Sequence, residues 1–197
     1  MDRIIEYSYY PWGPFLYKTK LFPEEIKQIK LLFKKDKKKD YRKNLAGLLK
    51  EEYEINEKKL FPIISPYING YTKAYINYTG STKIIHTDKI KLKKSWVNFM
   101  KKNESNPMHT HDNDLSFVLY TQIPKGLPKE YRSTLSTSKP GNINFVINYG
   151  IKNSICSHSF FPEVGDFYIF PANLVHYVNP FTCKGERISV SGNLSYV

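Results

Sequence analysis

The sequence predicts a mainly β protein, a jelly roll preceded by a helical layer, and two observations support this. Before about residue 84, apolar residues recur at helical spacing; beyond it they fall into short runs rich in β-branched and aromatic residues, separated by Pro and Gly. The chain has 197 residues, 41% of them hydrophobic, which is enough for one core. We therefore expect a single domain over 1–197, with a helical N-terminal layer (1–84) and a β core (85–197).

The helical layer is predicted from three segments. In FPEEIKQIKLLFKKDKKK, a Pro and two acids at the start and lysines at the end suit the helix dipole, and an apolar stripe predicts a helix at about 23–36. NLAGLLKEEYEI, from residue 44, is typical of a short helix or turn. EKKLFPIISPYINGYTKAYINYTG predicts a helix that is started or broken near Pro62 and Pro66 and runs to about Tyr78.

The β core is predicted from five runs with strand composition and no helical pattern between them. This succession favours a sandwich or barrel. The runs are KIKLKKSWVNFM, LSFVLYTQI, NINFVINYG, DFYIFP and RISVSGNLSYV.

The net charge of +12 is concentrated in the first half of the chain. Residues 1–104 carry 23 basic and 12 acidic residues, whereas 105–197 carry 7 and 6. The basic residues are almost all Lys, including KKDKKK at 34–39, and Lys is less suited than Arg to specific phosphate or base recognition. A solvated face is one interpretation, and a nonspecific surface for nucleic acid or an acidic partner is the other.

Several classes of protein are disfavoured. No run of eighteen apolar residues predicts a membrane span, and MDRIIEYSYYPWGPF does not have the pattern of a secretory signal, so we expect a cytoplasmic protein. Cys156 and Cys183 lie in no CxxC pattern, so we expect neither a disulfide framework nor a zinc knuckle.

The first candidate site is the pair His109 and His111 in NPMHTHDNDLSFVLY. On a strand, residues i and i+2 point to the same face, so the two imidazoles would project together and could chelate a transition metal. Taken alone, the pair is equally compatible with two surface histidines.

A second candidate group follows in EVGDFYIFPANLVHYVNPF and GERISVSGN. His176 comes after an apolar strand and a turn, and eleven residues later Arg187, one of only four arginines, opens an otherwise uncharged strand. Ser189 shares its face. An Arg that points into a barrel needs an anionic partner, and a carboxylate ligand held by the guanidinium and the serine hydroxyl would supply one.

The ordered set His109-x-His111, His176, Arg187-x-Ser189 resembles the Fe(II)- and 2-oxoglutarate-dependent oxygenases. Over about residues 92–195, the quoted phrases resemble the oxygenase-like proteins of tailed marine phages and of bacteria. The resemblance implies a double-stranded β-helix, Fe(II) as cofactor, and 2-oxoglutarate and O2 as co-substrates. It also implies hydroxylation of a prime substrate with release of succinate and CO2. If the chain is encoded by a virus, the resemblance implies that it acts in the host cytoplasm.

The same resemblance implies the site residues, with one departure from the family pattern. The usual H-x-D reads His109-Thr110-His111 here, so a His occupies the carboxylate position. The metal is therefore held either by His109, His111 and His176, or by a set in which Asp112 or Asp114 folds back to supply the carboxylate. Arg187 and Ser189 would hold the distal carboxylate of 2-oxoglutarate.

Weaker candidates accompany these. Asn98 and Tyr120 would reach the co-substrate from neighbouring strands, although a locally bonded Asn and a core Tyr explain them as well. Asp166 is more typical of a turn. His86 and His158 fit no motif.

Two other classes of function stay open on the sequence. One is a cupin-like three-histidine metalloprotein, an isomerase or a 2-oxoglutarate-independent dioxygenase. The other is a non-enzymatic binding module that retains the barrel. The prime substrate (protein, nucleic acid or metabolite) and the oligomeric state are not encoded in any motif that we recognise.

Overall fold

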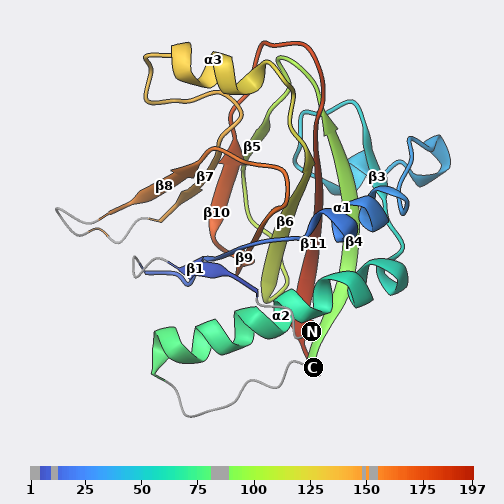
Figure 1. Cartoon of the computed structure of the whole chain (residues 1–197), viewed down its shortest axis with the longest axis vertical. Helices are drawn as coiled ribbons and strands as arrows, with labels where there is room; N and C mark the ends of the chain where they lie inside the picture. The colour runs from blue at the N-terminus through green and yellow to red at the C-terminus, as the bar shows by residue number, and fades with distance from the viewer. Residues whose placement is uncertain (1–4, 10–12, 81–88, 148–149, 151–154) are drawn as a thin grey trace.

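Two antiparallel sheets pack face to face in the computed structural model, which describes residues 5–9, 13–80, 89–147, 150 and 155–197 (Figure 1). The larger sheet has the order β1 (Tyr7–Tyr9), β2 (Tyr17–Lys20), β9 (Asp166–Pro171), β6 (Leu115–Gln122), β11 (Arg187–Tyr196), β4 (Ile90–Met100), β3 (Glu52–Glu54). The smaller sheet has the order β5 (Asn106–His109), β10 (Val175–Val178), β7 (Ile143–Val146), β8 (Ser157–Phe160). The expected jelly-roll architecture is confirmed.

Each face of the large sheet packs against a separate apolar core, because successive side chains of a strand point to opposite faces. The outer core lies between the large sheet and the helices, and the inner core lies between the two sheets. On β6, Phe117 and Leu119 pack towards the helices, whereas Val118 and Tyr120 pack between the sheets. β9 alternates in the same way. Between the sheets, these side chains meet Phe145 of β7, which closes the inner core.

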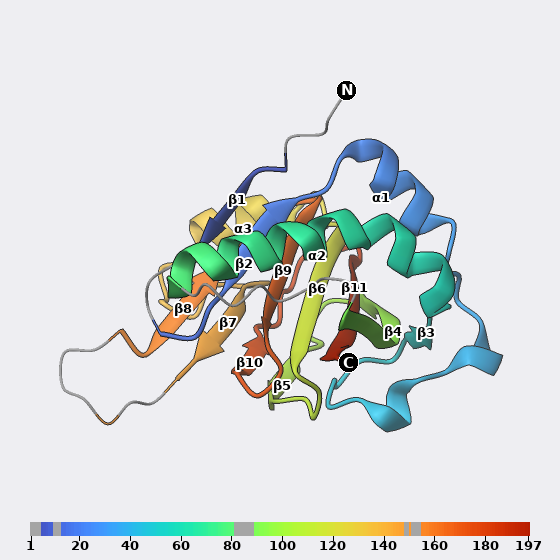
Figure 2. The ribbon, with the colours of Figure 1, turned by 90° about the horizontal axis from the view of Figure 1, so that it is seen from below.

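Helix α2 (Glu57–Thr79) covers the outer face of the large sheet and lies across its strands (Figure 2). The side chain of Asn56 caps its first turn by accepting from the backbone N–H of Lys59, and Gly80 ends it in the left-handed conformation. Pro66 removes the N–H that would bond to the carbonyl of Pro62, and the Ser65 hydroxyl donates to that carbonyl instead, at 3.2 Å. The helix predicted for this segment is confirmed.

The N-terminal half departs from the prediction in other places. The helix expected at 23–36 is α1 (Pro23–Lys30), which is shorter, and it is followed by a short 3-10 turn at Lys37–Lys39. After α1 the chain turns so that Leu32 and Phe33 pack on the outer core and Lys35 forms ion pairs, and these tertiary contacts override the helical pattern.

The helical layer expected over 1–84 therefore also contributes strands. β1, β2 and β3 extend both edges of the large sheet, and each has only three or four residues, too few to show a period of two. The segment interpreted as a short helix or turn, residues 44–55, begins at the end of a 3-10 turn, Arg42–Asn44, and contains strand β3 in place of a helix. In the second half, a short helix not expected from the sequence, α3 (Leu127–Ser133), follows β6. No helix among the described residues is long and apolar enough to span a membrane.

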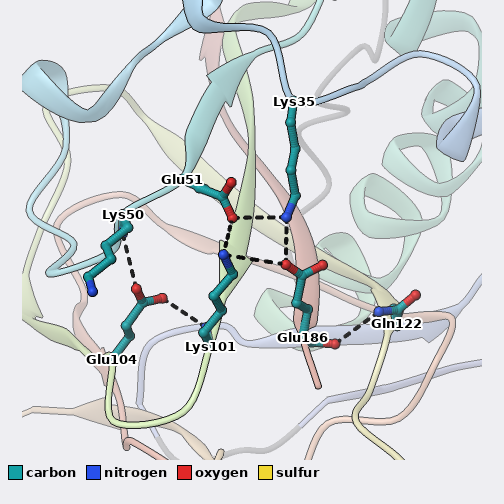
Figure 3. Close-up of polar contacts among 7 residues, drawn as sticks. All are labelled: Lys35, Lys50, Glu51, Lys101, Glu104, Gln122 and Glu186. Carbon is teal, nitrogen blue, oxygen red and sulfur yellow. Dashed lines mark hydrogen bonds and ion pairs between the residues drawn. The ribbon is translucent and has the colours of Figure 1, made fainter. Parts of the chain in front are cut away.

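A four-residue ion-pair network joins the loop after α1 to the strands at one edge of the large sheet (Figure 3). Glu51 lies just before β3, and its Oε2 is 2.9 Å from Nζ of Lys35 and 2.6 Å from Nζ of Lys101, which follows β4. Glu186, just before β11, pairs with the same two lysines at 2.5 and 3.8 Å. These side chains are partly exposed, so each pair contributes little stability, but together they fix how β3, β4 and β11 begin or end.

Gly192 in β11 has no space for a side chain, because an ideal Cβ there would lie 2.6 Å from the carbonyl oxygen of Lys94 and 2.7 Å from the ring of Phe117. We predict that Gly192→Ala lowers the free energy of unfolding by about 1–3 kcal/mol, measured by urea denaturation. Gly80→Asn is the control, since Gly80 faces open space in a conformation that Asn tolerates. Equal stability of the two variants would contradict the close packing of β11.

Candidate metal centre

Three histidines meet at one end of the small sheet. His109 is the last residue of β5 and lies directly opposite His176 of β10, with ring centroids 4.2 Å apart. His111 lies two residues beyond β5, where its backbone N–H donates to the carbonyl of Ala172 at 2.8 Å. Each ring offers one nitrogen, and these three atoms all lie within 4.8 Å of one another. That spacing suits a single metal ion bound by all three.

Backbone contacts fix the tautomer of two of these rings. Nδ1 of His109 lies 2.7 Å from the carbonyl oxygen of Pro107, and Nδ1 of His176 lies 2.9 Å from that of Leu174. A carbonyl can only accept, so each Nδ1 carries the proton and Nε2 keeps its lone pair. Histidines that bind a metal through one nitrogen usually donate their other ring N–H in this way.

Burial also keeps the three imidazoles neutral. Burial lowers the pKa of His176 to about 3 and the pKa of His111 to about 4, and the neighbouring His109 adds to both shifts. Burial also lowers the pKa of His109. Neutral imidazole is the form that binds metal.

Carboxylates do not join the cluster in the described part of the chain. Asp112 and Asp114 are both exposed, and Oδ2 of Asp114 accepts from the backbone N–H of Tyr196 at 2.9 Å. The geometry therefore favours the three-histidine alternative over a set that contains Asp.

Arg187 lies in the same pocket and has no acidic partner among the described residues. Its side chain is 3% exposed, Nη2 donates to the hydroxyl of Tyr120 at 2.9 Å, and the guanidinium lies 4.6 Å from the centre of that ring. Its Nε is buried without a hydrogen-bond partner. A buried cation in this state is costly, so the site is suited to an anionic ligand.

The other predicted residues of the large sheet line this pocket too. Nδ2 of Asn98 donates to the hydroxyls of Ser189 and Ser191, at 3.3 and 3.2 Å. Together with the histidines, Arg187 and Tyr120, these residues enclose a pocket of about 260 Å³. Asn98 and Tyr120, the weaker candidates, thus lie beside Arg187 and Ser189.

The remaining candidates lie elsewhere. Asp166 forms a turn and an ion pair, accepting from the backbone N–H of Glu163 at 3.0 Å and lying 3.2 Å from Lys18. His158 is on β8 and is not part of the cluster, and His86 lies outside the described residues. Neither Cys156 nor Cys183 forms a disulfide among the described residues.

Sequence reasoning missed one pocket residue of consequence, Glu52. This carboxylate on β3 is 1% exposed, lines the pocket, and has no partner for Oε2. Burial raises its pKa to about 7; Arg42 opposes this shift, and Glu104 and Asp40 add to it. In the sequence, Glu52 is one of four acids in EEYEINE, so only the three-dimensional pairing of β3 with β4 distinguishes it.

Comparison with protein families identifies the chain's relatives. Residues 94–193, half of its length, match the family model of 2OG-Fe(II) oxygenases. The chain belongs to this oxygenase family. It therefore uses Fe(II) as cofactor and 2-oxoglutarate as co-substrate. No curated protein matches the chain significantly by sequence.

Solved structures share the fold of this oxygenase at low identity. A prolyl-4-hydroxylase from Pseudomonas putida is 12% identical, with a TM-score of 0.52 and coverage of 94% of each chain. HygX from Streptomyces hygroscopicus, solved with nickel and 2-oxoglutarate, is 8% identical (TM-score 0.54; 92% of this chain and 83% of that one). The α-ketoglutarate-dependent epimerase SnoN from nogalamycin biosynthesis is 12% identical (TM-score 0.53; 92% and 76%).

The residues of this pocket fit both Fe(II) and 2-oxoglutarate. Three neutral imidazoles that converge suit Fe(II), and a buried guanidinium with an unpartnered N–H suits a carboxylate of 2-oxoglutarate.

Glu52 should make the stability of the metal-free protein depend on pH. Its pKa is higher in the folded chain than its ordinary value, so the folded state holds this proton more tightly, and stability falls as pH rises from about 4.5 to about 7. We predict that Glu52→Gln is more stable than wild type above pH 7, by about 2–3 kcal/mol, and that the difference vanishes near pH 4.5. Urea denaturation of both proteins across this range measures it, and a constant difference would exclude Glu52 as the titrating group.

Proposed function

We propose that this oxygenase is a dioxygenase that hydroxylates its prime substrate, with His109, His111 and His176 as iron ligands. The observation that supports this most directly is the placement of a preorganised three-nitrogen cluster and an unpaired, buried Arg187 in one pocket. In the balanced reaction, substrate C–H, O2 and 2-oxoglutarate give substrate C–OH, succinate and CO2. Fold neighbours include an epimerase, so hydroxylation is the finer part of the proposal.

The histidines hold the ion without contributing charge. Pro107 and Leu174 orient the rings of His109 and His176 through Nδ1, so that the lone pairs are aimed before metal arrives. Three protein ligands would leave the ion accessible to the co-substrate. When bound, iron supplies the redox chemistry, with 2-oxoglutarate as the source of two electrons.

Arg187 anchors the distal carboxylate of 2-oxoglutarate, and Ser189 assists from the same face of β11. The planar guanidinium can donate two parallel hydrogen bonds, and Tyr120 holds it in place by accepting one N–H and packing its ring against the cation. Asn98 holds the hydroxyl of Ser189 in position. The low exposure of all four side chains excludes water, which strengthens these contacts.

A cupin-like metalloprotein that does not use 2-oxoglutarate is the alternative that the three-histidine cluster would allow if taken alone, and the match to the 2OG-Fe(II) oxygenase family argues against it. It gives no role to a buried Arg187. Anaerobic titration with Fe(II) and then 2-oxoglutarate separates the candidates: our proposal expects a weak visible charge-transfer band on adding the second component, and succinate on admitting air. A site that binds iron but gives neither signal would support the alternative.

His176→Ala should abolish iron binding, because it removes one of three ligand atoms and the ring most deeply buried among them. Iron content after anaerobic loading and desalting measures this. His158→Ala, which removes a histidine outside the cluster, should load as wild type does. Wild-type loading of His176→Ala would refute the assignment.

Arg187→Lys should raise the dissociation constant for 2-oxoglutarate roughly ten- to a hundredfold, because Lys keeps the charge and loses the fork. Iron affinity should not change, since Arg187 is not a ligand. Titrations of both components on one preparation measure this, with Arg132→Lys on α3 as control. If 2-oxoglutarate affinity is unchanged, Arg187 is a structural residue.

A further inference from the structure

Glu52 is a buried acid in the pocket that neither iron binding nor co-substrate binding uses. Its side chain forms no ion pair among the described residues, and Oε2 is without a hydrogen-bond partner. Arg42, whose charge lowers the pKa of Glu52, is itself bound to Asp40 by hydrogen bonds of 2.5–3.1 Å. A carboxylate left in this state is costly, as is an unpaired buried cation.

Further unpartnered acceptors lie in the same pocket. Oδ1 of Asn98 and Oδ1 of Asn106 are buried without hydrogen-bond partners, and both residues line the pocket with Glu52. Asn98 pairs directly with Glu52 across β4 and β3. Unsatisfied acceptors that line one pocket with a carboxylate match a ligand group that is rich in N–H donors and positively charged.

An aromatic ring lines the same pocket as Glu52 and lies beside one of the histidines. Trp96 is two residues from Asn98 on the same face of β4, lines the pocket, and has its ring centroid 5.7 Å from that of His111. The ring of Tyr41 stacks on the indole of Trp96, with the ring centroids 6.0 Å apart, and this contact holds the indole in place. The face of an indole attracts cations and packs against the carbon chain that carries them.

Polar contacts hold the chain on both sides of the buried Glu52 side chain. Its neighbour Glu51 belongs to the ion-pair network with Lys35 and Lys101, and Glu104 accepts from the backbone N–H of Lys50 at 3.3 Å and of Lys101 at 2.8 Å (Figure 3). Gly47 lies against the carboxylate, since a Cβ there would be 2.8 Å from Oε1. The acid is therefore preorganised, as a recognition group should be.

We propose that Glu52 recognises a basic nitrogen of the prime substrate, a protonated amine or a guanidine. This rests on the proposed function, of which it names the substrate class. The cation lies at the Glu52 end of the pocket, and the carbon chain runs past Trp96 towards the histidines. The oxidised carbon is therefore several bonds away from the nitrogen.

Binding of small probes tests this without requiring turnover. We would titrate n-butylammonium, n-butylguanidinium and neutral 1-butanol into the metal-free protein by calorimetry at pH 7.5, and repeat each titration anaerobically with Fe(II) and 2-oxoglutarate. The wild type should bind at least one cation tenfold or more tightly than 1-butanol. Glu52→Gln should lose at least tenfold of that affinity, and Glu54→Gln, on the same strand but outside the pocket, should lose none.

Protonation gives a second measurement that needs no variant. A proton and the cation compete for Glu52, so cation affinity should rise between pH 6 and pH 8 in the wild type. The infrared band of a buried protonated carboxyl should also fall when n-butylammonium is added at pH 6.5.

The proposal is overturned if Glu52→Gln binds the cations as wild type does, if 1-butanol binds equally well, or if neither cation binds. Because the metal-free titration requires neither iron nor 2-oxoglutarate, its failure is distinguishable from that of the proposed function, which the anaerobic Fe(II) titration tests by itself.

Discussion

The pairing of β11 with β4 on one side and β6 on the other aligns the pocket residues that these three strands carry. Ser189 is opposite Asn98 and Tyr120, and Arg187 is opposite Met100. Because the side-chain period is two, a slip of one residue would send Arg187 and Ser189 into the apolar layer beneath α2. The close contact of Gly192 with both neighbouring strands, and the ion pairs of Glu186 before the strand, oppose such a slip.

The pocket that results contains unpaired groups of both charges. Arg187 on β11 has an unused N–H donor, Glu52 lies two strands away on β3 with an unused acceptor, and the neutral histidines line the same pocket. Without a carboxylate ligand, the ion would keep its full double charge, one unit more than in a site with two histidines and an acid. Such a centre attracts the anionic co-substrate strongly and repels a cation, so a carboxylate placed away from the metal is needed to hold a basic substrate.

Sequence reasoning reached the jelly roll, the family and the pocket residues of the second half, because strand composition and the spacing of His109, His111, His176 and Arg187 are local signals. It did not reach β1, β2 and β3, which are too short to show a period. It also left the third ligand open, since only the folded chain shows Asp114 bonded to Tyr196 and His111 turned towards His176. Glu52 carries no local signal at all, because its significance comes from pairing across the sheet with a strand some forty residues later.

β3 lies before the segment that defines the family, which begins at residue 94. It is a three-residue edge strand that pairs with β4 alone, so its sequence can drift without disturbing the register of the central strands. With Glu52 in the role proposed above, the residue that selects the substrate and the residues proposed to hold iron and 2-oxoglutarate lie on separate stretches of the polypeptide. A change at this one edge position could then alter the substrate without altering the rest of the site.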